Sequence, residues 1–338
     1  MAFDPASLRV LTGAHEPLRH HRPDDGLGFG GKDEAVEALA ELLPELRGLH
    51  DRLNAQRTWS FLIILQAMDA AGKDGIVKHV LTGFNQQSCH VTSFSAPVGA
   101  EVAHSFLWRC TAPLPARGHI GVFNRSYYEE AIVPRVRTEY IPYQRLPTQC
   151  LHGDITATKQ GGGGMENGKW KMEKAGTARA FAEFDAKLKN THGVAPKEPS
   201  PEFWHARLDD INAFERHLAR SGTRVVKFFL HLSRAEQKKR FLARIDDTAR
   251  NWKFSPADVR DRRHWEQYHH VYSEILTTTS TPWAPWYVIP ADYKYVARLA
   301  VAKVLAHELE LLHPKYPRLD KHGRKDLAKA KKILEKED

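Results

Sequence analysis

The sequence predicts an α/β fold in which helices cover both faces of a five-stranded parallel sheet. Short apolar runs alternate with longer helical stretches, as in consecutive βαβ units. The first run, residues 60–65, is almost entirely apolar, which is typical of a strand buried on both faces. Such connections bring the carboxyl ends of all strands to one edge of the sheet, so the ligand is expected there.

Strands are expected at residues 60–65, 90–94, 119–124, 224–232 and 286–290. Helices are expected at residues 33–56, from 74 onward, 98–108, 211–220 and about 293–311. The helix at 33–56 has leucines at helical spacing, and Gly222 suits the end of the helix before the fourth strand. Asp292 and Lys294 could reach the ligand site, but the preferred interpretation is that Asp292 is the N-cap of the last helix.

One domain, residues 33–312, is expected to contain the sheet, after an N-terminal surface arm at 1–32. Residues 313–338 are expected to form a charged tail or helix. Residues 144–203 have little apolar periodicity and are predicted to be a surface insertion, with one helix near 177–189. Four lysines of the insertion could hold a polyanion, although a solvated loop is the preferred interpretation: Lys159, Lys169, Lys171 and Lys174.

The composition favours a basic protein of a reducing compartment. Lys and Arg number 50 against 41 Asp and Glu, and the net charge of +9 suits a polyanionic partner without identifying it. The three cysteines form no CxxC pattern, which favours the cytoplasm over secretion. No apolar run reaches the ~18 residues of a membrane span, and the N-terminus has no signal-peptide core. A cytoplasmic protein without a membrane partner is therefore expected.

The first strand leads directly into a phosphate-binding motif, WSFLIILQAMDAAGKDG at residues 59–75. Small residues leave backbone N–H groups accessible, Lys73 supplies a positive charge, and a helix N-terminus follows. The residues expected to contact phosphate in this loop are Ala70, Ala71, Gly72, Lys73, Asp74 and Gly75. The alternative is an ordinary strand, turn and helix with an accidental Gly-Lys pair.

The motif departs from GxxxxGK[ST], because Ala67 replaces the first glycine and Asp74 the hydroxyl residue that binds magnesium. A carboxylate is therefore expected to replace the hydroxyl as a ligand. Asp69 lies inside the loop and Asp74 directly follows the lysine, and both offer the hard oxygen atoms that Mg²⁺ prefers. Mg²⁺ is the expected cofactor, with Mn²⁺ as an alternative.

A second polar group follows the third strand. That strand ends on Asn124 and Arg125, and a helix bearing Glu129 and Glu130 begins soon after. Metal and phosphate ligands of an α/β kinase belong at this position. The alternative interpretation is a turn followed by a solvated first turn of helix.

Residues 232–256 have the pattern of a basic lid. Arg240 and Arg244 share one face of a predicted helix whose other face is apolar, and Arg250 and Lys253 follow. Such a helix packs on one side and directs cations across a phosphate chain on the other. A solvated basic helix is the alternative. The lid is placed at about 233–272.

Together these segments resemble the polyphosphate kinase 2 family, whose members transfer phosphate between inorganic polyphosphate and nucleotides. The matching motifs are AMDAAGKDG at 67–75, FNRSYYE at 123–129, KFFLHLS with RFLARIDD in 227–247, NWKFSPAD at 251–258 and APWYVIPAD at 284–292. The resemblance implies a P-loop kinase-like three-layer fold with a helical lid. It also implies Asp69 as the magnesium ligand, Lys73 as the phosphate-binding lysine and Arg125 in the Walker B region.

Two positions point to a subgroup of the family. Class I members typically have Asp where this chain has Asn124, and Asn where it has Glu129. The form found here resembles class III, which uses AMP as well as ADP, so Asn124 and Glu129 are expected to position the nucleotide. Asp69, Lys73, Arg125 and Glu129 form the predicted catalytic set.

The expected partners are polyphosphate, AMP, ADP and ATP, without nucleic acid, in a homo-oligomer (a dimer or a tetramer). One alternative is an ATP-dependent nucleotide or small-molecule kinase, which would share the loop. A non-catalytic polyanion-binding protein would explain the charge of +9 but not the pairing of Asp69 with Lys73.

Overall fold

The computed structural model describes residues 3–146, 150–152, 198–249 and 251–337, without the side chain of Lys253. Arg250, the helix expected near 177–189 and the four lysines of the insertion lie outside these ranges. In the part described, five strands form one parallel sheet in the order β2-β3-β1-β4-β5. They are β1 Ser60–Ala67, β2 Cys89–Ser93, β3 Ile120–Asn124, β4 Thr223–His231 and β5 Trp286–Pro290.

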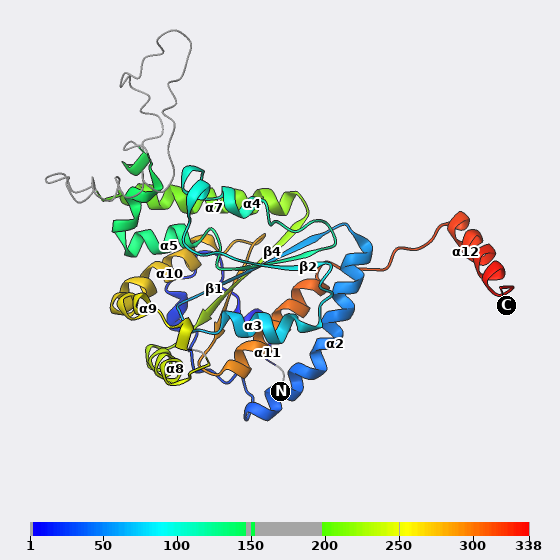
Figure 1. Ribbon diagram of the computed structural model, residues 1–338, viewed down its shortest axis with the longest axis horizontal. Helices are drawn as coiled ribbons and strands as arrows, with labels where there is room; N and C mark the ends of the chain where they lie inside the picture. Colours follow the sequence, from blue (N-terminus) through cyan, green and yellow to red (C-terminus); the bar gives the residue numbers. More distant parts are fainter. Residues whose placement is uncertain (1–2, 147–149, 153–197, 250, 338) are drawn as a thin grey trace, which may run out of the picture.

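Helices cover both faces of this sheet, which confirms the predicted α/β fold (Figure 1). One face is covered by α2 Lys32–Gln56, α3 Lys73–Val80 and α11 Lys294–Glu310. The other is covered by α5 Glu129–Val136, α7 Pro201–Arg220 and α10 Trp265–Thr279.

The segment after β4 comprises α8 Arg234–Asp246, η6 Asn251–Lys253, α9 Pro256–Asp261 and η7 Arg262–His264. The remaining short elements are η1 Pro5–Leu8, α1 Pro17–His20, η2 Leu81–Gly83, η4 Thr138–Gln144 and η5 Cys150–His152.

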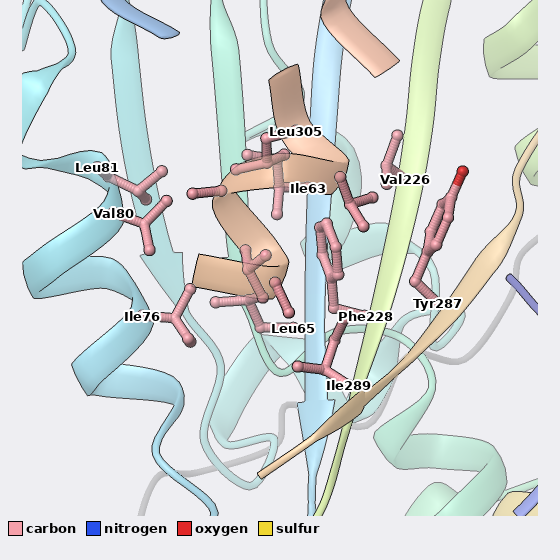
Figure 2. Close-up of a cluster of buried hydrophobic side chains, with 14 of the residues drawn as sticks. Ile63, Leu65, Ile76, Val80, Leu81, Val226, Phe228, Tyr287, Ile289 and Leu305 are labelled. Carbon is pink, nitrogen blue, oxygen red and sulfur yellow. The ribbon is translucent and has the colours of Figure 1, made fainter. Parts of the chain in front are cut away.

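All eight residues of the central strand β1 are buried. Successive side chains point to opposite faces, so Ile63 and Leu65 pack on the α11 side while Ile64 packs on the α10 side. Figure 2 shows Ile63 and Leu65 among Phe228 of β4, Leu305 of α11 and the side chains of α3. Burial on both faces explains why the strand is a nearly continuous apolar run.

The prediction of one helix at 98–108 is wrong. The chain forms two short pieces instead, η3 Gly99–Ala103 and α4 Trp108–Thr111. Gly99 has a φ of +59°, and His104 is extended with φ −110° and ψ 168°, so no helix continues through the segment.

The end of the predicted insertion belongs to the core. Helix α7 begins at Pro201 rather than near 211. Ser200 is its N-cap, and the Ser200 side chain accepts a hydrogen bond from the N–H of Phe203. Phe203 and Trp204 are buried. Proline and serine at 199–201, which suggested a loop, are instead the start signals of a helix.

The N-terminal arm packs against the sheet, whereas the C-terminal helix does not. In the N-terminal arm Leu8, Val10 and Leu18 are buried, and Arg9 forms an antiparallel bridge to Tyr287 of β5. At the other end, α12 Lys321–Leu334 lies apart from the sheet in Figure 1. No helix among the described residues combines the length and apolar character needed to cross a membrane.

An ion pair is buried in the α10 side of the core. Lys227 of β4 donates to Glu215 of α7 at 2.6 Å, and both side chains are fully buried. Tyr127 and Tyr128 donate to the same carboxylate at 2.8 and 2.9 Å. Burial raises the pKa of Glu215 and lowers that of Lys227 to about 8, and the contact between them opposes both shifts.

Replacing Lys227 with methionine is expected to lower the free energy of unfolding by about 3–5 kcal/mol, because Glu215 remains buried without its partner. Urea unfolding followed by circular dichroism measures the change. The double variant Glu215→Gln with Lys227→Met is expected to recover part of the loss. An unchanged unfolding midpoint for Lys227→Met would contradict this account of the core.

Candidate active site

The loop between β1 and α3 has the form of a phosphate cradle. It turns sharply through Ala70 and Gly72, whose φ values of +63° and +113° are left-handed. Glycine adopts this conformation freely, whereas alanine pays a conformational cost there. Helix α3 then begins at Lys73, so the N–H groups of its first turn face the carboxyl edge of the sheet.

Lys73 lies against the end of the strand that precedes the loop. Its Nζ donates to the carbonyl of Ala67 at 3.1 Å. Burial and then Arg125 lower the pKa of Lys73, whereas Asp69, Glu129 and Asp74 raise it. A partly buried cation of this kind interacts more strongly with an incoming anion than an exposed one, because less water screens it.

Strand β3 brings Arg125 to the same edge. In the parallel register Asn124 pairs with Leu65 of β1, and the backbone N–H of Arg125 donates to the Leu65 carbonyl at 3.0 Å. Arg125 has a φ of +65°, an unusual value for a residue other than glycine. Its guanidinium donates to Asp69 Oδ1 at 2.9 Å and thus joins the two loops.

Glu129 lies on the other side of Arg125. Its Oε2 is 3.8 Å from Nη1 of Arg125, and Gln66 donates to its Oε1 at 2.8 Å when the amide faces it. Burial raises the pKa of Glu129, and the cations Arg125 and Lys73 oppose this shift. The structure therefore brings together all four predicted catalytic residues, with Arg125 between two carboxylates.

The residues at this edge suit a metal that is shared with a substrate. Among the described residues, no three His, Cys, Asp or Glu side chains lie close enough to hold an ion by themselves. Mg²⁺ in kinases commonly takes one or two carboxylates and completes its shell with phosphate oxygens and water. Asp69 meets this requirement, and Asp74 is nearby, since Asn124 donates to its Oδ1 at 3.1 Å.

A large cavity of about 940 Å³ opens beside Asp69, Arg125 and Glu129. Pockets of 300–1,000 Å³ hold small molecules of nucleotide size. Aromatic rings of Tyr268 and Tyr272 from α10 also line the cavity. These tyrosines could not be predicted from the sequence, because an apolar helical pattern does not distinguish a cavity wall from a core.

A second charged group lines the same cavity. Arg109 donates to Glu130 Oε1 at 3.2 Å, and Arg207 donates to the Glu130 carbonyl at 2.8 Å. The Arg207 guanidinium lies 5.0 Å from the ring centre of Phe106 and 4.5 Å from that of Phe203. Burial lowers the pKa of Arg207 to about 10, still high enough to keep it charged at neutral pH. Arg109 and Arg207 were not predicted as site residues, because they come from distant segments and belong to no local motif.

The predicted lid cations have different surroundings. Arg244 is 25% exposed, stacks over Phe241 and lies 3.7 Å from Asp258, which lines the cavity. Arg240 does not share this exposure. Only 8% exposed, it donates to backbone carbonyls of the phosphate loop and of the segment after β5.

The expected role of Arg240 as a cation that grips substrate is therefore corrected. Helical spacing places Arg240 and Arg244 on one face of α8. Arg240 packs against the phosphate loop, however, whereas Arg244 is partly exposed to solvent. Asp292 is corrected as well. Its side chain accepts from the N–H of Ser233 at 2.8 Å, whereas Tyr293 precedes α11 without a side-chain cap.

The comparisons with known proteins identify the family of this chain. The sequence profile of the family described as Polyphosphate kinase 2 matches residues 30–147 and 185–317. The chain belongs to the polyphosphate kinase 2 family. Its matched ranges contain the loop, Arg125, Glu129 and the segment that includes α8.

Two bacterial members of the family are similar to this chain over most of their length. The ADP-polyphosphate phosphotransferase of Rhodopseudomonas palustris is 41% identical, with 90% of each chain covered. The AMP/ADP-polyphosphate phosphotransferase of Meiothermus ruber is 34% identical, with 91% of this chain and 94% of that protein covered. The crystal structure of polyphosphate kinase 2 from Arthrobacter aurescens superimposes with a TM-score of 0.73, at 32% identity and with 97% of each chain covered.

Proposed function

We propose that this protein transfers phosphoryl groups between inorganic polyphosphate and nucleotides, converting AMP to ADP and ADP to ATP. The observation that carries this proposal is the array of Asp69, Arg125 and Glu129, which lies beside the Lys73 loop and lines a cavity of about 940 Å³. Family membership supports the same reaction, since the similar proteins are named as phosphotransferases for ADP or for both AMP and ADP.

The reaction needs positioning and charge neutralisation more than covalent chemistry. Lys73 and the loop N–H groups bind oxygens of the transferred phosphate. Arg125 faces the negative charge that spreads over that phosphate, while its contacts with Asp69 and Glu129 fix its direction. No covalent intermediate with the protein is required.

Asp69 would hold Mg²⁺, and Mn²⁺ would meet the same oxygen atoms. The ion, when bound, supplies further neutralisation of phosphate charge. The nucleoside occupies the cavity, and polyphosphate extends from the loop toward Arg244. We further propose that the protein acts in the cytoplasm as a homo-oligomer, a dimer or a tetramer, and has no nucleic-acid partner.

A donor comparison tests the function. Purified protein is incubated with AMP, ADP or GDP and Mg²⁺, with polyphosphate or ATP as the phosphate donor, and the nucleotides are separated by ion-exchange chromatography. The proposal predicts higher phosphates from AMP and ADP with polyphosphate. Transfer from ATP to an acceptor, with none from polyphosphate, would instead support the ATP-dependent kinase.

Arg244→Ala is expected to raise the KM for polyphosphate about fivefold, since a partly exposed ion pair contributes about 1 kcal/mol. The KM for the nucleotide is expected to change less, and the difference to shrink at high salt, because ions screen the contact. Initial rates at varied polyphosphate measure the effect. Lys239→Ala, which removes an 80% exposed cation from the same helix, is the control with parental kinetics. Equal increases in both KM values would contradict this role for Arg244.

A further inference from the structure

Helix α8 holds the carbonyl side of the phosphate loop. Gln237 donates through Nε2 to the Asp69 carbonyl at 2.9 Å. Arg240 donates through Nη1 to the carbonyls of Ala70 and Ala71 at 3.0 and 2.9 Å. Three consecutive peptide groups of the loop are therefore fixed by two side chains that lie one turn apart on the same helix.

The N–H groups of Arg240 are all used within the protein. Beyond the loop, Nη2 donates to the carbonyls of Ala291 and Asp292 at 2.6 and 2.9 Å, and Nε donates to Glu236 at 2.9 Å. A guanidinium has five N–H donors, and these contacts account for five. Arg240 thus binds two loops and a neighbouring carboxylate, with no donor left for a phosphate.

This arrangement has a direct effect on the phosphate side of the loop. A peptide group is planar and trans, so a carbonyl held on one side turns the following N–H toward the other. The bonds from α8 thereby direct the N–H groups of residues 70 and 72 away from the helix, while the N–H of Ala71 donates to the Met68 carbonyl at 3.3 Å. They also hold Ala70 in its left-handed conformation, which persists only where the surroundings enforce it.

A third side chain extends the contact to the cavity. Arg262 donates through Nη1 to Gln237 Oε1 at 2.8 Å and also lines the cavity. Because the amide oxygen accepts this bond, the amide nitrogen faces Asp69 and donates to its carbonyl. The orientation of Gln237 is thus set from the cavity wall.

We propose that Gln237 and Arg240 are positioning residues that preorganise the phosphate loop for transfer, and that Arg240 acts by its five-bond geometry rather than by its charge. This inference rests on the proposed function, because it assigns the loop a transferred phosphate. It separates the segment after β4 into a fixed part, which ends at Arg240, and a part from Arg244 onward that faces substrate.

The decisive variant is Arg240→Lys, which keeps the positive charge but has one nitrogen in place of the planar group. A misplaced loop is expected to lower kcat about 100-fold, as displacement of positioning groups commonly does, while the KM for polyphosphate changes less than about twofold. Arg240→Met is expected to lose as much kcat as Arg240→Lys, because a positive charge alone does not replace the bonds from Arg240 to the loop. We call these bonds, together with the bond from Gln237, the clamp. Retention of kcat in Arg240→Lys, with a raised KM for polyphosphate, would overturn the proposal in favour of substrate binding.

Gln237→Leu provides a second variant, since it replaces the amide with an apolar group of similar size and so removes one loop contact. It is expected to lower kcat about tenfold, a smaller loss than Arg240→Lys because one bond is removed rather than several. Circular dichroism and thermal unfolding verify the fold of each variant. If Arg240→Lys does not fold, Gln237→Leu decides alone: parental kcat in it would overturn the proposal.

Amide hydrogen exchange gives a readout that does not depend on turnover. Residues 68–72 are expected to exchange faster in Gln237→Leu and Arg240→Lys than in the parent, while the amides of β1 keep their protection. If the parent transfers no phosphate from polyphosphate, the proposed function is wrong. Faster exchange of the loop amides in the two variants would still support the clamp. Unchanged exchange of the loop in both variants would overturn the inference even if the parent is active.

Discussion

Lys73→Ala is expected to reduce polyphosphate-dependent turnover by about 100-fold or more. Lys73 is a partly buried cation at the first turn of α3, and water would supply no equivalent charge to a phosphate bound in the loop. Initial rates of ADP phosphorylation at saturating polyphosphate measure the loss. Within the described residues the side chain donates its hydrogen bond to the Ala67 carbonyl, at the edge of the sheet rather than in the core, so its removal is expected to preserve the fold.

Lys78→Ala is the matched control for this prediction. It removes the same charge from an exposed position in the same helix, outside the loop and the cavity. Its turnover is expected to equal that of the parent. A folded Lys73→Ala variant with activity within a few-fold of the parent would contradict the assignment of the loop as the phosphate site.

Glu129→Asn is expected to slow phosphorylation of AMP about tenfold more than that of ADP, a difference of about 1.4 kcal/mol in the barrier. An AMP acceptor places its attacking phosphate deeper toward the loop, so it depends more on the direction of Arg125. We expect Glu129 to act on this phosphate through Arg125, 3.8 Å away, because a carboxylate repels an anion. Matched rates with AMP and with ADP measure the difference.

The ionisation of Glu129 gives this prediction a pH signature. Burial raises the pKa of Glu129 above its usual 4.5, and the active form is the carboxylate that orients Arg125. Activity with AMP is therefore expected to fall as pH decreases through this raised pKa, before a normal glutamate would be protonated. Glu129→Gln should lack this part of the profile. Equal slowing of both acceptors would contradict the role in AMP use and leave the family assignment intact.

The sequence predicted the loop and its partners well because they depend on local signals. An apolar strand followed by small residues and Gly-Lys determines the turn before Lys73. Arg125 and Glu129 follow the end of another strand, and the parallel register brings that end to the same edge. Asp69 and Arg125, 56 positions apart, could thus be placed together from their strands alone.

Other features depend on which surfaces meet in three dimensions. The spacing of Arg240 and Arg244 gave a common helix face, but only the packing of α8 on the loop separates a clamp from an exposed cation. Arg207 enters the cavity from α7, a helix whose start resembled the end of an insertion. Such contacts between distant segments have no sequence period from which they could be derived.

The most direct test of the account is a time course with AMP, polyphosphate and Mg²⁺ as the only substrates and ion. Ion-exchange chromatography of the quenched reaction follows AMP, ADP and ATP together. The account predicts that ADP appears first and ATP follows as ADP accumulates, with neither formed when polyphosphate is omitted. Intact AMP after prolonged incubation, in a preparation that also leaves ADP unchanged, would contradict the central claim that this site transfers phosphate from polyphosphate to nucleotides.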